Sequence, residues 1–290
     1  MVSPIQSRGM ALLDYMGGKT DGIACAGVVQ INDKVVEIYG EIHGSTNPFY
    51  EGLLDGGLVS DYEVLCEMTP ASCRYYRSLC ANARRRTTGL PHLVAHLPRA
   101  PVCVDIRDAH HLPSGSEERA YQQLFAQRSC SALAASSVAT VADRMQQARA
   151  TLRGSHARFT RAFGCAYEQL MRVVDRELAI VQALVRLGSH FIHRHWDALC
   201  CVGAALTRNV QKACGALVDL HVESLLHSST SRRIAVFTGA AHAFRLIDLV
   251  FRDTGRFVVD PSDDLMVELL FWPEGDDELE QVLMLALHRT

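Results

Sequence analysis

The sequence lacks several features that would assign it to a specialised class of protein. Its longest apolar run, Ala198–Leu206, is far shorter than the ~20 residues that a membrane-spanning helix needs. Met1–Thr20 contains no apolar segment of the kind found in signal peptides. No Cys-x-x-Cys pair occurs among the ten cysteines, which argues against a zinc ribbon or a disulfide framework. We therefore expect a soluble, cytoplasmic protein without a membrane span.

An excess of basic residues is also absent. The chain has 29 Lys and Arg against 32 Asp and Glu, a formal net charge of −3, whereas dedicated nucleic-acid binders are strongly basic. Hydrophobic residues make up 48% of the chain, as in ordinary globular proteins. We expect one domain over residues 1–290 and no nucleic-acid partner, and the sequence leaves the oligomeric state open.

Short apolar segments alternate with a helical segment in the first third of the chain. Ile23–Gln30 and Lys34–Tyr39 are rich in β-branched residues and flank an Asn-Asp turn, which predicts a hairpin. Glu63–Glu67 and Val102–Asp105 predict two short strands, and Ser72–Arg86 between them predicts a helix. This spacing favours βαβ units and a parallel sheet.

A long segment from about 116 to 230 then shows helical periodicity and little proline. The strand–helix alternation returns after it, with expected elements at Arg233–Thr238, Ala243–Asp253, Phe257–Val259, Met266–Phe271 and Asp276–His288. The predicted fold is therefore α/β, with a mostly parallel central sheet flanked by helices. The helical insertion of about 116–230 separates its early and late βα units.

Polar residues follow successive predicted strands at equivalent places. Glu41 and His43 follow the first strand of the parallel set, Glu67 ends the second, Asp105 ends the third, and His242 follows the fourth. Because the carboxyl ends of parallel strands form one edge, where ligands bind in open α/β sheets, we expect these side chains to converge in one crevice.

Carboxylates beside imidazoles fit hydrolytic chemistry in two ways. Such a set can hold a divalent metal ion such as Mn, Co or Zn, which lowers the pKa of a bound water and polarises a carbonyl. Without a metal, a histidine oriented by a carboxylate can act as a general base. The residue types alone leave both mechanisms open.

Three segments resemble the signatures of a known superfamily. Gly40–His43, Val64–Met68 and Val236–His242 are similar to the GExH or GxxH, strand-end Glu and late Gly-x-x-His motifs of the erythromycin esterase/ChaN-like/Tiki–TraB superfamily. Val104–Arg107 resembles the Asp-Arg element of the Tiki–TraB branch. The long helical insertion also matches that layout.

The resemblance implies a layered α/β core with one site at the rim of the sheet. Tiki members are divalent-metal-dependent proteases, erythromycin esterases hydrolyse a macrolactone with an essential histidine, and ChaN-like members bind haem. By this resemblance the catalytic residues and candidate metal ligands are Glu41, His43, Glu67 and His242. Asp105 and Arg107 correspond to substrate-binding positions.

The leading hypothesis is therefore a divalent-metal-dependent hydrolase that acts on a peptide or a small-molecule ester. One alternative is a metal-free esterase in which His43 is the general base. Another is a catalytically inactive scaffold of the same fold that binds haem or a partner.

Overall fold

The computed structural model describes residues 22–42, 48–55, 58–80 and 87–260. The chain forms two compact units. One contains the described residues up to Ile106 together with those from Val218 onward, and we call it the sheet unit. The other, Arg107–Leu217, we call the helical unit.

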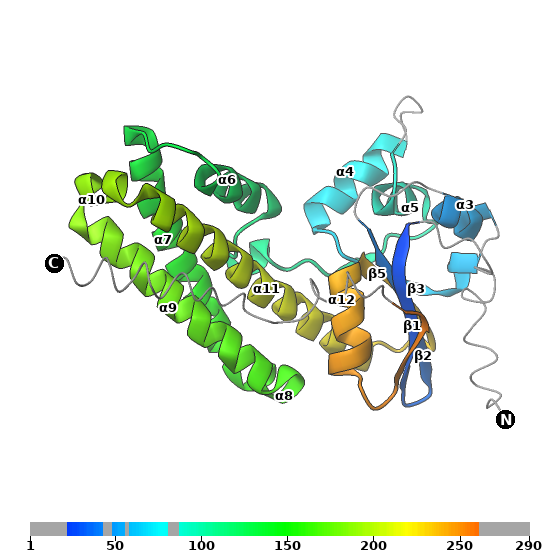
Figure 1. Cartoon of the computed structure of the whole chain (residues 1–290). Helices are drawn as coiled ribbons and strands as arrows, with labels where there is room; N and C mark the ends of the chain where they lie inside the picture. Colours follow the sequence, from blue (N-terminus) through cyan, green and yellow to red (C-terminus); the bar gives the residue numbers. More distant parts are fainter. Residues whose placement is uncertain (1–21, 43–47, 56–57, 81–86, 261–290) are drawn as a thin grey trace. The chain divides into compact units, whose positions relative to one another are not determined.

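The sheet unit is built around a six-stranded sheet with strand order β4-β3-β5-β2-β1-β6 (Figure 1). The strands are β1 (Ile23–Ile31), β2 (Lys34–Glu41), β3 (Glu63–Cys66), β4 (Val102–Cys103), β5 (Arg233–Gly239) and β6 (Gly255–Val259). Strands β2, β5, β3 and β4 pair in parallel. Strand β5 comes from late in the chain, yet it lies between β3 and β2.

The sheet is mixed, which corrects the expectation of a mostly parallel one. The predicted hairpin is confirmed: β1 pairs antiparallel with β2 from Ile31↔Lys34 onward, and Asn32 in the turn has a φ of 55°, which asparagine tolerates. Strand β6 also pairs antiparallel with β1. The tight turn after β1 reverses the chain direction and makes β1 antiparallel to β2. Because β6 is also antiparallel to β1, the sheet has antiparallel pairs on both sides of β1.

Helices cover both faces of this sheet. On one face α3 (Pro48–Asp55), α4 (Pro70–Cys80) and α5 (Leu90–His96) contribute to a core around Tyr39 and Phe237. The sequence pattern does not indicate α5, because a proline normally ends a helix. Here Pro91 lies in the first turn of α5, where its missing N–H is not needed.

The other face packs against α12 (Ala240–Phe244), the π-helical turn η3 (Arg245–Val250) and the last turns of α11. The single helix predicted for Ala243–Asp253 is therefore an α-helical turn that widens at Arg245. Two further predicted elements, Met266–Phe271 and Asp276–His288, lie outside the described residues, as does the end of the predicted helix Ser72–Arg86.

The helical unit fills the segment in which the sequence predicts a helical insertion. Its helices are α6 (Gly115–Phe125), α7 (Ala132–Gly154), α8 (His156–Phe163), α9 (Cys165–Leu187), α10 (Ser189–Arg194) and the first part of α11 (Trp196–Ser228). A short 3-10 turn, η2 (Asp108–His110), precedes them. Among the residues that the structure describes, no helix has the length and apolar character needed to cross a bilayer.

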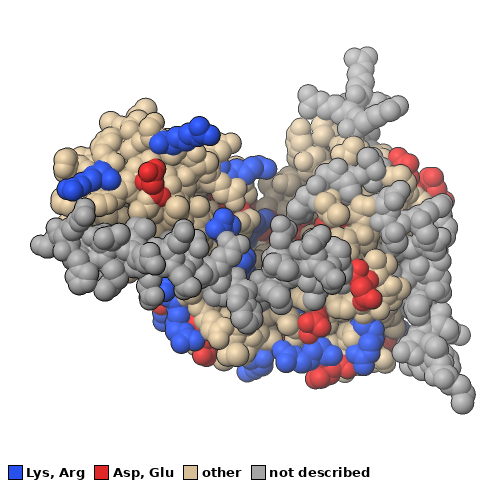
Figure 2. Space-filling view, viewed as in Figure 1, with Lys and Arg blue, Asp and Glu red and all other residues tan. Residues whose placement is uncertain are grey.

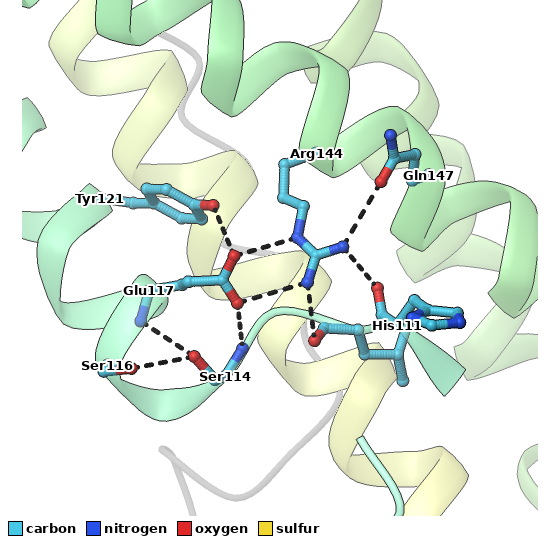
Figure 3. Close-up of polar contacts among 8 residues, drawn as sticks. His111, Ser114, Ser116, Glu117, Tyr121, Arg144 and Gln147 are labelled. Carbon is cyan, nitrogen blue, oxygen red and sulfur yellow. Dashed lines mark hydrogen bonds and ion pairs between the residues drawn. The ribbon is translucent and has the colours of Figure 1, made fainter. Parts of the chain in front are cut away.

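An arginine ties the first two of these helices together. Ser114 and Glu117 form a capping box at the start of α6. The guanidinium of Arg144 on α7 contacts both carboxylate oxygens of Glu117, at 3.1 and 3.3 Å (Figure 3). It also donates a hydrogen bond of 2.8 Å to the backbone carbonyl of His111. The same glutamate thus caps α6 and fixes its position against α7.

Candidate active site at the carboxyl ends of the parallel strands

The parallel strands end at one edge of the sheet, as the sequence predicts. Glu41, the last residue of β2, pairs with Gly239, the last residue of β5. Glu67 follows β3 directly, and its backbone N–H donates a hydrogen bond of 2.9 Å to the backbone carbonyl of Phe237 on β5. His242 lies in α12, three residues beyond β5. The tips of three neighbouring strands thus bring Glu41, Glu67 and His242 to the same edge.

Both ring nitrogens of His242 face carboxylates. Nδ1 lies 2.5 Å from Oδ1 of Asp219, and Nε2 lies 3.2 Å from Oε1 of Glu67. Ionised carboxylates only accept hydrogen bonds, so both nitrogens must donate, which requires the imidazolium form. Burial by itself would lower the pKa of His242, but the charges of Glu67 and Asp219 and their hydrogen bonds outweigh it and raise that pKa to about 9.

Glu67 is held as a carboxylate. Its Oε2 accepts hydrogen bonds from the hydroxyl of Thr238 and from the N–H of Gly239, both at 2.7 Å. Burial raises the pKa of Glu67, but the His242 imidazolium and these donors have the larger combined effect and hold it well below its usual range. The Gly239 amide is thus bound to Glu67.

Two residues that the sequence analysis did not single out complete the cluster. The side chain of Asp219 on α11 is fully buried, and its Oδ2 accepts from Nε of Arg245 at 2.5 Å. Arg245 is the first residue of the π-helical turn η3 and is itself almost fully buried. The one signal in the sequence was that Asp219 stands within an apolar helical stretch. A carboxylate buried in such a stretch needs a partner of opposite charge.

The guanidinium of Arg245 also lies beside the imidazole, with Nη2 3.1 Å from Nδ1 of His242. Because Nδ1 donates to Asp219, it cannot accept from Arg245 as well. Asp219 therefore lies between two cations, and Glu67 adds the second anion. The four groups form a buried cluster without net charge, which we call the Asp219–His242–Glu67–Arg245 cluster.

The remaining predicted site residues lie in different surroundings. Glu41 is buried at the end of β2, and its Oε2 accepts from the hydroxyl of Tyr50. Burial and the Glu41 charge raise the pKa of Tyr50 well above its ordinary value. Asp105 is also buried, two residues after β4, and its N–H contacts the carbonyl of Met68 at 3.4 Å. Arg107 belongs to the helical unit, and His43 lies outside the described residues.

Gly40 allows close packing between the sheet and α12. It lies within β2. A Cβ there would be 2.9 Å from the backbone of Ala240 and 2.8 Å from Cβ of Ala243. The missing side chain lets α12, which carries His242, pack directly on the sheet.

The described residues do not by themselves form the metal centre that the sequence suggests. No group of three or more His, Cys, Asp or Glu within the described ranges is arranged to hold a metal ion. In the imidazolium form, Nε2 of His242 carries a proton and has no lone pair for a metal ion. Oε1 of Glu67 alone is then left as a ligand from this pair, whereas catalytic zinc sites use three protein ligands. His43 would be a further ligand, so the metal hypothesis, like the haem hypothesis, stays a prediction.

The fold and this cluster define an α/β protein with a carboxylate–imidazolium site at the carboxyl edge of its parallel strands. Comparisons with family models, curated proteins and solved structures gave no match. The superfamily resemblance therefore rests on the sequence motifs.

Proposed function

We propose that this chain is a hydrolase that cleaves an ester or peptide bond of a substrate. The reaction takes place at the carboxyl edge of the parallel strands, with Glu67 and His242 as catalytic residues. The observation that carries the proposal is the contact of 3.2 Å between Nε2 of His242 and Oε1 of Glu67. A proton donor and a proton acceptor lie side by side there, and His242 remains partly accessible, with 14% of its side chain exposed.

The pair can supply both proton transfers of a hydrolysis. The Glu67 carboxylate takes a proton from a water molecule as its oxygen attacks the substrate carbonyl carbon. The His242 imidazolium gives its Nε2 proton to the leaving oxygen or nitrogen as the acyl bond breaks. Transfer of the proton from Glu67 to His242 across their contact then restores the starting state. Water is consumed, and an acid and an alcohol or amine are released.

The other members of the cluster prepare His242 for this role. Asp219 fixes the ring through Nδ1 and stabilises its positive charge, and Arg245 holds the Asp219 carboxylate. This assignment differs from the metal-free alternative considered above, because His242 is the acid and Glu67 the base. It includes no step that requires a metal.

A substrate panel with two variants tests the proposal. Wild type, His242→Gln and Glu67→Gln are assayed on nitrophenyl esters and on fluorogenic peptides. We expect each variant to lose about 10²- to 10⁴-fold in kcat, the usual contribution of general acid–base catalysis. His190→Gln is the matched control, because His190 is exposed in the helical unit; it should keep full activity.

A chelator distinguishes the mechanisms. The proposal expects activity to survive EDTA and extensive dialysis. Loss of activity that Mn, Co or Zn restores would overturn it and favour the metal-dependent hydrolase. Absence of turnover on every substrate, with haem binding seen by absorbance, would favour the inactive scaffold.

A further inference from the structure

Two histidines lie one helical turn apart on α5, which covers the face of the sheet opposite to the one that packs against α12. His92 is partly buried, and His96, the last residue of the helix, is exposed. Residues four apart share one side of a helix, and the two rings are in contact. Their centroids are 4.3 Å apart and their planes are tilted by 38°. We call these residues the α5 histidine pair; they take no part in the proposed hydrolysis.

Each ring of the α5 histidine pair uses one nitrogen on the backbone. Nδ1 of His96 lies 2.9 Å from the carbonyl oxygen of His92, and the ring of His92 donates a hydrogen bond to the backbone carbonyl of Thr87. A carbonyl only accepts, so the contacting nitrogen donates, and in a neutral imidazole the other nitrogen has a lone pair. Histidines that ligate metals are oriented by such N–H contacts. The pair thus offers two imidazole lone pairs on rings whose orientation is fixed.

The surroundings favour a neutral His92. Burial and the charge of His96 lower the pKa of His92, although the charge of Glu51 and the contact with Thr87 act in the opposite direction. An imidazole with a pKa below its ordinary value of about 6.5 is uncharged at pH 7.5. Metal ligation requires this neutral form.

The neighbouring helix α3 adds negative charge. Its Glu51 and Asp55 are exposed, and α3 and α5 share one hydrophobic core. Figure 2 shows acidic side chains at the upper right of the sheet unit, where α3 lies in Figure 1. The charge of Glu51 acts on His92, so it also attracts a cation bound to that ring.

We propose that the α5 histidine pair binds one divalent transition-metal ion of the kind that prefers imidazole ligands, such as Ni²⁺, Cu²⁺ or Zn²⁺. Within the described ranges no group of three or more His, Cys, Asp or Glu is arranged to hold a metal ion. The site therefore has two protein ligands, His92 and His96, and water completes the coordination. Mg²⁺ and Ca²⁺ are excluded because they take oxygen ligands.

Calorimetric titration of the untagged full chain with Ni²⁺ at pH 7.5 tests the proposal. We expect saturable binding that His92→Gln and His96→Gln each weaken about 10²-fold, because one imidazole alone loses the advantage of two linked ligands. His156→Gln and His190→Gln, at exposed histidines of the helical unit, are the matched controls and should leave Kd unchanged. An excess of Mg²⁺ should not displace Ni²⁺.

Chemical labelling locates the site in the unaltered protein, so the test does not depend on whether a variant folds. Diethyl pyrocarbonate modifies neutral imidazole nitrogens, and mass spectrometry of the peptides reports each histidine separately. Because a bound metal ion occupies the reactive lone pair, Ni²⁺ should slow the labelling of His92 and His96. Labelling of His156 should stay the same.

A variant of the candidate active site separates this result from the hydrolase proposal. His242→Gln should bind Ni²⁺ with unchanged Kd, so a protein without hydrolase activity can still confirm the site. The proposal is overturned if the folded protein shows no saturable binding of Ni²⁺, or if His92→Gln and His96→Gln bind it as tightly as wild type. It is also overturned if Ni²⁺ leaves the labelling of both residues unchanged.

Discussion

Asp219 places a buried carboxylate oxygen 2.5 Å from Nδ1 of His242, and this contact joins a helix to the turn after the last parallel strand. A carboxylate on one ring nitrogen fixes the orientation of the ring and favours its charged form. The opposite nitrogen is then directed at Glu67. The protonation state of the proposed acid is thus set by a residue 23 positions earlier in the chain.

Asp219→Asn should lower the pKa of His242. The neutral amide keeps the shape of Asp219 but removes one of the two negative charges that raise this pKa to about 9. We expect the pKa to move toward the ordinary histidine value of about 6.5. Nitrogen NMR of the imidazole during a pH titration measures it. Asp175→Asn, in the helical unit, is the control, and an unchanged His242 titration in Asp219→Asn would contradict the assignment.

The activity of the wild-type enzyme should fall at high pH. The imidazolium is the proton donor in the proposed reaction, and His242 loses its proton near pH 9. We therefore expect kcat to be level around neutral pH and to decline with a midpoint near 9. Measurement of kcat from pH 6 to 10 checks this. A rise in kcat through the same range would indicate that neutral His242 acts as a base instead.

Stability should show the same titration. The folded pKa of His242 lies above its unfolded value of 6.5, so its contribution is fully present below pH 6.5 and is lost as pH rises through about 9. The shift corresponds to about 3 kcal/mol. Glu67 has a lowered pKa, so its contribution is present above about pH 4.5 and is lost in acid.

Urea unfolding of wild type and His242→Gln at pH 6 and pH 10 measures the His242 contribution. The free energy of unfolding should differ more between the two proteins at pH 6 than at pH 10. An equal difference at both pH values would show that His242 is not charged in the folded protein.

Gly40→Ala should destabilise the protein and impair the site. The added methyl group would lie within 3.0 Å of Cys25, Ala240 and Ala243, which forces α12 away from the sheet. We expect a loss of about 1–3 kcal/mol in the free energy of unfolding and a lower kcat. Urea unfolding and the esterase assay measure both effects. Gly154→Ala is the control, because a Cβ at Gly154 meets no atom within 4 Å; a similar loss there would contradict the packing argument.

Glu177→Gln should stabilise the helical unit at neutral pH. Burial raises the pKa of Glu177 to about 7, although Asn209, which donates to both of its oxygens, and the charges of Arg176, Arg208 and Lys212 act in the opposite direction. As pH rises from about 4.5 to 7, Glu177 loses its proton in the unfolded chain before it does so in the folded one, so the free energy of unfolding falls over this range. Glutamine removes this penalty, and we expect a gain of about 2–3 kcal/mol at pH 8.

Urea unfolding at pH 4 and pH 8 checks this prediction. The gain should be small at pH 4, where Glu177 is protonated in both states. Glu168→Gln, at an exposed position of the same helix, should change stability little at either pH. A Glu177→Gln protein that is less stable than wild type at pH 8 would contradict the prediction.

The sequence alone determined that Glu41, Glu67 and His242 lie at or just beyond the ends of parallel strands, whereas Asp105, predicted to end the third strand, lies two residues beyond the end of β4. The apolar runs that precede Glu67 and His242 are local patterns, and parallel pairing brings the strand ends together whatever the side chains beyond them do. The hairpin was equally local, because Asn32 and Asp33 favour a tight turn. Its effect on the sheet was not local: β6 returns beside β1 and makes the sheet mixed.

Only the tertiary structure decided the partners and the charge of His242. Asp219 lies within a helix whose periodicity gives no sign of where its polar face will pack, and Arg245 reaches it only because both are buried against the same side of the sheet. Protonation depends on burial and on the distances to neighbouring charges, and neither is encoded in spacing along the chain.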